Sequence, residues 1–291
     1  MTLLSPQDWQ QQGQYFKYKN HQVFYRTAGV GEPLVLIHGF PTSSWDWYKV
    51  WDKLAQNYHV IAFDMTGFGF SDKPRSYEYS IHDQADLFEA LARHLAIKQC
   101  HLLVHDYGNT VAQEILARHD ESKNHGFPKI NSVCFLNGGL FPEMHRALLV
   151  QKILKSPFGI FLTYLNSKNT LRKSFEKLYG PAGIEAAEID GYWQIICHQN
   201  GHRLLHKLIH YISDRRRHRA RWVGALQQTH VPLRLIDGPE DPVSGRHLAE
   251  YYLEMIPNPD VVLIEGAGHY PQTEAPEAVL KHYFEFRDMH V

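Results

Sequence analysis

The chain has 291 residues, of which 44% are hydrophobic and 21% are charged, and its formal net charge is −1. This length and composition are typical of a globular protein with one large core, or of a core with an inserted subdomain. A nearly neutral chain has no overall field that would recruit nucleic acid or an anionic membrane, so we expect it to act on small molecules.

Segments for targeting, membrane insertion or metal binding are not indicated. No apolar run approaches the length needed to cross a bilayer, and the first nine residues lack the basic start and apolar core of a secretion signal. We therefore expect a cytoplasmic protein that does not contact membranes. The scattered cysteines Cys100, Cys134 and Cys197 predict neither a disulfide framework nor a zinc site, and the 20 histidines show no metal-binding spacing. We expect no metal and no cofactor.

Short apolar runs dominate the first half of the chain. They predict strands at 34–37, 60–63, 102–104 and 133–136, each buried on both faces, after an earlier strand at 21–26. Amphipathic segments at 81–95 and 110–118 have the helical spacing of Leu, Ala and Ile. Strands that alternate with helices in this way predict an α/β fold with a parallel sheet.

The pattern changes from residue 139 to about residue 226. Apolar residues recur there at spacings of three and four, through 148–154, 189–197 and 204–212, which predicts helices. The strand pattern resumes at 233–236 and 261–264, and a last helix is expected near 276–287. The sequence thus predicts an α/β core made of residues 1–138 and 227–291, interrupted by a helical cap at 139–226.

A short basic run at 214–221 lies inside the predicted cap. It could mark a surface for an anionic partner. We expect a solvated helix face instead, because the run is short and the rest of the chain is neutral.

Asp106 has the most informative surroundings in the chain. It ends an apolar strand, Gly108 follows two residues later, and a helix opens at once. This is the pattern of a nucleophile elbow with a carboxylate where the usual motif has serine. Carboxylate attack on an ester would give only a labile anhydride, so Asp106 is better suited to displacement at saturated carbon, as in epoxides and alkyl halides. The alternative is an aspartate that only caps the following helix.

A carboxylate nucleophile needs a base that activates water in a second step, and that base needs an orienting acid. His269 lies between glycines after the strand at 261–264, and Asp241 lies in the loop after the strand at 233–236. We expect His269 to be the base and Asp241 the acid. Asp237 and Glu240 share the loop with Asp241, and a capping or surface histidine is the alternative for His269.

The strand at 34–37 ends in a turn that can support the nucleophile. Gly39 permits close backbone approach, and Phe40 can present its N–H toward the elbow. Together with the N–H of Tyr107 it would form an oxyanion hole. We also expect His38 and Trp45, in the same turn, to contact the substrate. A plain strand-to-helix turn is the alternative.

These motifs resemble the α/β-hydrolase superfamily, in its epoxide hydrolase and haloalkane dehalogenase branch. The resemblance extends over essentially the whole chain and is carried by residues 38–41, 67–74, 105–108, 241 and 268–269. It implies an α/β-hydrolase fold, with a mostly parallel sheet flanked by helices and an inserted helical cap, and catalytic roles for Asp106, Asp241 and His269. The chain is also similar to the mesoderm-specific transcript protein group, which has no settled activity to carry over, at residues 38–48, 105–108, 137–143 and 221–226.

Two departures distinguish the activities of this branch. Dehalogenases place a tryptophan after the nucleophile to hold the leaving halide, and this chain has Tyr107, whose phenol could donate instead. Many also have an asparagine where this chain has Phe40, whereas His-Gly-Phe-Pro is typical of epoxide hydrolases. Those enzymes protonate the epoxide oxygen with cap tyrosines, and Tyr211 lies where one would be expected. Candidates for a second tyrosine are Tyr164, Tyr179 and Tyr192.

The sequence therefore predicts a hydrolase that opens epoxides to diols. An ester would form on Asp106, and His269, oriented by Asp241, would activate the water that cleaves it. Haloalkane dehalogenation is the alternative within the same class, and a non-catalytic protein that binds small ligands is the alternative of another class. The aromatic richness of the chain indicates a small apolar substrate.

Overall fold

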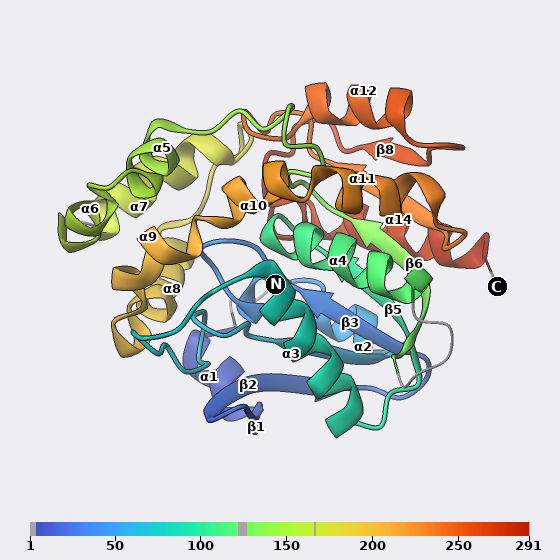
Figure 1. Ribbon diagram of the computed structural model, residues 1–291, viewed down its shortest axis with the longest axis horizontal. Helices are drawn as coiled ribbons and strands as arrows, with labels where there is room; N and C mark the ends of the chain where they lie inside the picture. The colour runs from blue at the N-terminus through green and yellow to red at the C-terminus, as the bar shows by residue number, and fades with distance from the viewer. Residues whose placement is uncertain (1–3, 122–126, 166, 291) are drawn as a thin grey trace.

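The computed structural model describes residues 4–121, 127–165 and 167–290, and within them eight strands form one sheet (Figure 1). The strands are β1 (Gln14–Tyr18), β2 (His21–Ala28), β3 (Pro33–Ile37), β4 (His59–Phe63), β5 (Gln99–Val104), β6 (Lys129–Phe135), β7 (Leu233–Asp237) and β8 (Val261–Leu263). Their order across the sheet is β1-β2-β4-β3-β5-β6-β7-β8. Only the pairs β1–β2 and β2–β4 are antiparallel, so the predicted mostly parallel sheet is confirmed.

Helices cover the sheet and fill the interval between β6 and β7. The helices outside that interval are α1 (Pro6–Gln11), α2 (Trp51–Ala55), α3 (Ile81–His94), α4 (Tyr107–Glu121), α12 (Arg246–Met255), α13 (Pro271–Glu274) and α14 (Pro276–Asp288). The helices inside it are α5 (Leu149–Lys155), α6 (Gly159–Leu165), α7 (Lys168–Leu178), α8 (Ala186–Cys197), α9 (Leu205–Leu208), α10 (Tyr211–Arg217) and α11 (Arg219–Gln228). Short 3₁₀ helices occur at Ser44–Trp47 and His198–Leu204.

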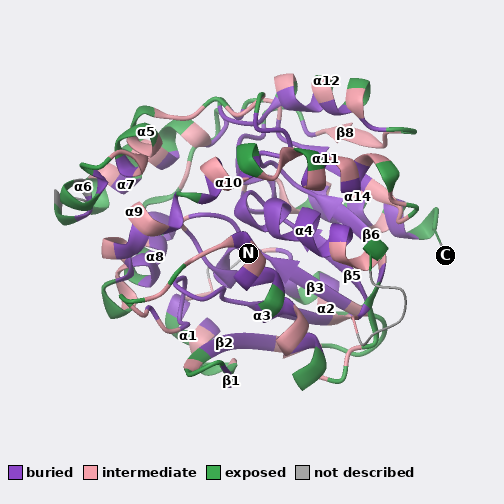
Figure 2. Ribbon diagram, in the orientation of Figure 1, coloured by how far each residue is buried: buried purple, intermediate pink, exposed green. Residues whose placement is uncertain are grey.

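The central strands are buried on both faces, as their apolar runs predict. In β3, Leu34 and Leu36 enter one hydrophobic cluster, while Val35 and Ile37 enter a second cluster on the other face of the sheet. Figure 2 shows the same strands as a buried layer inside the molecule. The carboxyl ends of these strands therefore meet at one edge of a rigid layer, where loops can present functional groups.

Between β6 and β7 the described residues form helices and no strand, as the sequence pattern predicts. Helices α5 to α9 lie to one side of the sheet in Figure 1, whereas α11 runs beside α4. The expected single helical segment at 204–212 is divided, because α9 ends at Leu208 and α10 begins at Tyr211. Tyr211 and Arg215 of α10 both approach Asp106, which follows the end of β5.

None of the described helices has the length and apolar character needed to cross a membrane. Of the nine N-terminal residues considered as a targeting signal, the first three lie outside the described residues.

Candidate active site

Asp106 occupies the sharp turn between β5 and α4. Its φ is +43°, in the left-handed region that residues with a side chain rarely adopt. Gly108 makes the turn possible, because a Cβ there would lie 2.4 Å from the carbonyl oxygen of Ile37. The backbone N–H of Asp106 donates to the carbonyl of Asn137 at 2.9 Å, which fixes the turn against the end of β6. This is the local geometry of a nucleophile elbow.

Donors from two other segments approach the carboxylate of Asp106. The backbone N–H of Phe40 donates to Oδ2 at 3.1 Å, as expected for one half of an oxyanion hole. The hydroxyl of Tyr211, at the start of α10, lies 3.5 Å from both carboxylate oxygens. Tyr107 begins α4 with its phenol beside Gln84. The part assigned to its backbone N–H stays a prediction.

His269 is paired with Asp241, as the sequence predicts. Nδ1 of His269 donates to Oδ2 of Asp241 at 2.6 Å, and the side chains of both are buried. Asp241 also accepts hydrogen bonds from the N–H of Val243 at 2.8 Å and the hydroxyl of Ser244 at 2.7 Å. These donors hold its carboxylate in the orientation that the imidazole needs.

The other two acids of that loop do not pair with His269. Glu240 is exposed. Asp237 is fully buried, and among the described residues its carboxylate oxygens have no hydrogen-bond partner. Burial, together with the nearby charge of Asp241, raises the pKa of Asp237 well above its ordinary value. A neutral acid cannot stabilise an imidazolium as Asp241 does.

His105 links the elbow to the loop of His269. Its Nε2 donates to the carbonyl oxygen of His269 at 2.7 Å. Burial, reinforced by the positive charge of His269, lowers the pKa of His105 to about 3, so it is a neutral donor. Its position directly before Asp106 ties the nucleophile and the base together through the backbone, a role that the sequence analysis did not assign.

The candidate nucleophile and base form a buried set of opposite charges. Burial would raise the pKa of Asp106, but the charges of His269 and Arg215 and the Phe40 N–H outweigh it and hold that pKa below its ordinary value. Burial would lower the pKa of His269, but Asp241 and Asp106 raise it to about 9. The resting site therefore holds an imidazolium between two carboxylates.

Arg215 is a site residue that sequence reasoning missed. It is only 2% exposed, and its Nη2 donates to the backbone carbonyl of Asp106 at 3.1 Å and lies 3.5 Å from the carboxylate Oδ1. Its Nε donates to the hydroxyl of Thr110 at 2.7 Å. The prediction that residues 214–221 form a solvated helix face is therefore wrong for Arg215. The missed signal is spacing, since Arg215 follows Tyr211 by four residues and shares its helix face.

Two of the expected substrate contacts, His38 and Trp45, are held by partners within the core. His38 stabilises its own turn, with Nδ1 bonded to the carbonyl of Gly39 at 2.8 Å and Nε2 accepting from the N–H of Met65 at 3.1 Å. Trp45 is fully buried and stacks on Tyr48 with 4.7 Å between ring centres. These contacts give both side chains a packing role, and their assignment as substrate contacts stays a prediction.

The candidates for a second cap tyrosine are also placed elsewhere. Tyr164 is 64% exposed and its ring contacts the guanidinium of Arg203, and its assignment to the substrate site stays a prediction. Tyr179 bonds to the hydroxyl of Thr273 at 3.0 Å, and Tyr192 packs against Trp45. Tyr211 is therefore the tyrosine that meets the nucleophile.

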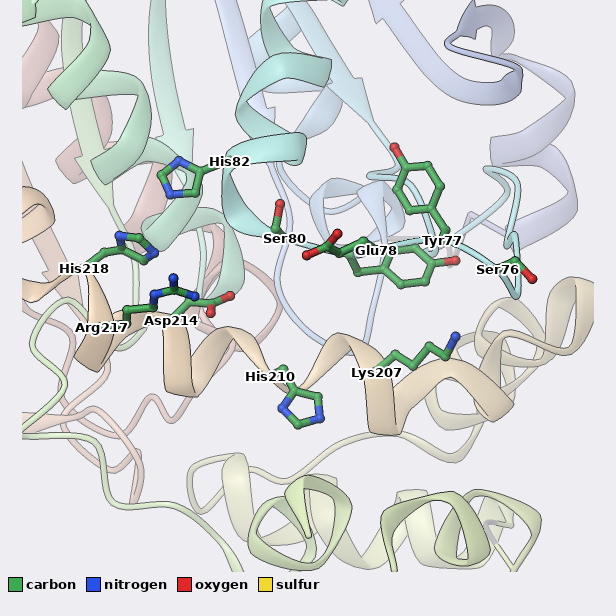
Figure 3. Close-up of a pocket in the computed structure, with 11 residues that line it drawn as sticks. Ser76, Tyr77, Glu78, Ser80, His82, Lys207, His210, Asp214, Arg217 and His218 are labelled. Carbon is green, nitrogen blue, oxygen red and sulfur yellow. The ribbon is translucent and has the colours of Figure 1, made fainter. Parts of the chain in front are cut away.

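Two cavities open on opposite sides of α10. One, of about 810 Å³, lies between the segment 76–82 and the residues of α9 and α10, and Figure 3 shows its two walls facing each other. Asp214 and Arg217 of α10 line it, but none of the candidate catalytic residues does. The other, of about 390 Å³, is lined by Arg215. Asp106 itself lines neither cavity, and Arg215 is the residue that connects the smaller one to Asp106.

Known proteins resemble this chain along most of its length. The alpha/beta hydrolase family matches residues 34–282. A mesoderm-specific transcript homolog protein of Bos taurus is 42% identical over 297 residues, which cover 97% of this chain and 88% of the relative. Two solved structures are similar in fold.

The first is epoxide hydrolase CorEH, with a TM-score of 0.78 and 20% identity over 94% of this chain and 97% of that chain. The second is the haloalkane dehalogenase DatA from Agrobacterium tumefaciens C58, with a TM-score of 0.80 and 18% identity over 96% of this chain and 97% of that chain. At these identities the likeness concerns the fold alone.

Proposed function

The chain belongs to the alpha/beta hydrolase family, and on that premise we propose that it opens epoxides to diols through an ester on Asp106. One observation carries the proposal. A charged carboxylate on a strained elbow lies beside a tyrosine hydroxyl and within the field of an imidazolium held by Asp241. The set contains a nucleophile, an acid and a base with its orienting group.

In the first step, a carboxylate oxygen of Asp106 attacks an epoxide carbon, the carbon–oxygen bond of the ring breaks, and the ring oxygen accepts a proton from Tyr211. Burial and the charge of Asp106 raise the pKa of Tyr211 well above its ordinary value, so the phenol is protonated at neutral pH. A positioned acid of this kind contributes about 10²–10⁴-fold to the rate.

In the second step, the change of charge at Asp106 frees the base. An ester is neutral, so alkylation removes one of the two carboxylates that raise the pKa of His269. His269 then gives its proton, through water, to the Tyr211 phenolate, and as a neutral imidazole it accepts a proton from the attacking water. The water oxygen attacks the ester carbonyl, and the N–H of Phe40 stabilises the oxyanion. The bond to the diol oxygen breaks as that oxygen takes a proton from His269, and the Asp106 acid that remains returns its proton to His269, which restores the carboxylate and the imidazolium.

The same geometry disfavours halide release as the main activity. The Tyr107 phenol is beside Gln84, and Phe40 supplies no side-chain donor to a leaving halide. We further propose that residues 139–226 act as the cap, since Tyr211 and Arg215 come from this interval. The cytoplasmic location stays a prediction.

The trapping experiment follows from the two steps. His269→Gln should still be alkylated on Asp106 but should release diol at least 10²-fold more slowly, so intact mass spectrometry should show protein plus one epoxide. His230→Gln, at an exposed histidine, is the matched control and should show no adduct. Wild-type turnover by His269→Gln, or an adduct that survives in Asp106→Ala/His269→Gln, would contradict the two-step scheme.

A substrate comparison separates the remaining candidates. We expect a higher kcat/KM for a terminal epoxide than for the matched bromoalkane, measured as diol and bromide release. Faster bromide release would favour the dehalogenase. Binding of both compounds without either product would favour a non-catalytic binding protein.

A further inference from the structure

The cavity of about 390 Å³ on the nucleophile side of α10 has an unusual charge. Four of its lining side chains are cationic, and no aspartate or glutamate lines it. The polar lining residues are His145, Gln151, Lys152, Lys155, Ser156, Arg215 and Arg216. A volume of this size fits a small organic ligand.

The charges at the rim of this cavity are not neutralised by the protein. Across residues 4–121, 127–165 and 167–290, no carboxylate lies within ion-pair distance of Lys152, Lys155 or Arg216. These side chains come from α5 and α10, which face each other across the cavity. A cluster of cations without a counter-ion attracts anions from solution.

His145 adds a neutral polar group to the same wall. Both of its ring nitrogens are buried and have no hydrogen-bond partner among the described residues. Burial, with the positive charge of Arg215 nearby, lowers the pKa of His145 to about 4. At neutral pH the ring therefore offers one donor and one acceptor, and leaving them unsatisfied is costly unless a ligand or water pairs with them.

Arg215 connects the cavity to the proposed nucleophile. Arg215 lines the cavity and also contacts Asp106, and its Nη1 has no hydrogen-bond partner among the described residues. Ile212, another lining residue, follows Tyr211 directly in α10. The side chain of Arg215 therefore separates an anion bound among these cations from Asp106.

We propose that this cavity is a subsite for an anionic group, a carboxylate or a phosphate monoester, carried by the substrate. The proposal rests on the proposed function for the identity of the reacting group and refines its substrate class from an apolar epoxide to an epoxide with an acidic end. Arg215 and Lys155 bind the anion, and Lys152 and Arg216 raise its local concentration at the rim.

Binding without chemistry tests the subsite independently of turnover. Titration calorimetry with octanoate, octyl phosphate and octanamide compares two anions with a neutral molecule of matched chain length. We expect at least one anion to bind about tenfold more tightly than octanamide, since hydrogen bonds to charged groups are strong. The tighter anion identifies the group. Equal affinities for all three compounds would overturn the proposal.

Paired variants tie the preference to the cavity. Lys152→Met/Lys155→Met should remove most of the anion preference, about fivefold or more. The control Lys173→Met/Lys177→Met removes the same charge from exposed positions of α7 and should retain the preference. An equal loss in both variants would mean that net charge, and not this cavity, selects the anion, and would overturn the proposal.

Kinetics then separate this proposal from the proposed function. The ratio of kcat/KM for 10,11-epoxyundecanoate to that for its primary amide should be about ten in the wild type and near one in Lys152→Met/Lys155→Met. A wild-type ratio of one with rapid diol formation would overturn the subsite and leave the epoxide hydrolase intact. Selective octanoate binding without diol formation from either compound would support the subsite and overturn the proposed reaction.

Discussion

A buried carboxylate remains charged only where its surroundings replace the water it has lost. Asp106 is 4% exposed, and burial alone would raise its pKa and favour the protonated acid. Arg215, the Phe40 N–H and the imidazolium of His269 together reverse that preference. The Tyr211 ring lies 4.5 Å from the Arg215 guanidinium, so the proposed proton donor also packs against the cation that favours the charged form of Asp106.

Tyr211→Phe tests the proposed role of the Tyr211 hydroxyl as the acid, because the substitution removes only that group. The ring and its packing are kept and the hydroxyl is lost, so alkylation of Asp106 should slow by about 10²-fold or more while ester hydrolysis is unchanged. Single-turnover kinetics with an activated epoxide resolve adduct formation from its decay. Tyr252→Phe, at a fully buried tyrosine of α12, is the control. Unchanged alkylation in Tyr211→Phe would remove this tyrosine from the mechanism.

At the scale of elements, α4 is fixed at its first turn by the elbow and farther along by α11. Glu114 of α4 is 1% exposed and accepts hydrogen bonds of 2.8 Å from Arg118, Arg221 and the Trp222 indole. Burial would raise the pKa of Glu114, but Arg221 and Arg118 hold it at about 2. The carboxylate therefore joins the end of the helical insertion to the helix that begins at the nucleophile.

Glu114→Ala should lower the free energy of unfolding by about 3 kcal/mol, because it removes the buried carboxylate that Arg118, Arg221 and the Trp222 indole N–H share. Denaturant unfolding measures the loss. Glu121→Ala, which removes another partner of Arg221 at an exposed position, should cost no more than about 1 kcal/mol. A similar loss of unfolding free energy in both variants would mean that the burial of Glu114 does not stabilise the contact between α4 and α11.

The sequence predicts best those elements that can be identified from their local residue pattern alone. β3 and β5 are continuous apolar runs because both faces are buried, and the strand–acid–helix pattern locates Asp106. β1 was missed because this edge strand is largely exposed and lacks an apolar run. Arg215 was missed because a row of arginines looks solvated until tertiary packing selects one of them.

Family membership and the mostly parallel α/β-hydrolase sheet, inferred from motifs, are confirmed for the molecule as a whole. The pairing of His269 with Asp241 was predictable from chain order, because loops after neighbouring strands meet at one edge of a parallel sheet. The packing roles of His38 and Trp45 could not be predicted, because the sequence of a turn does not indicate which of its side chains face the core.

The free energy of unfolding of the whole protein should depend on the protonation state of His269. The pKa of His269 is about 9 in the folded protein against an ordinary 6.5, so the folded state binds the proton more tightly. Its stabilising contribution is complete below pH 6.5 and is lost as pH rises through about 9. We expect the free energy of unfolding to fall across this window, with a slope of up to about 1.4 kcal/mol per pH unit from this proton.

Denaturant unfolding at pH 6.5, 7.5 and 8.5 measures the slope. His269→Gln should flatten it, whereas His230→Gln should follow the wild type. Parallel curves for wild type and His269→Gln would mean that the imidazole is not held in its charged form.

Helix α10 delivers Tyr211 and Arg215 together, and it belongs to the insertion, not to the sheet. Any motion that lifts α10 takes the proton donor and the counter-ion of Asp106 away at once. On the proposed mechanism, a molecule in which α10 has moved away lacks the hydroxyl that protonates the epoxide oxygen, so alkylation of Asp106 at the full rate requires this helix to be in place.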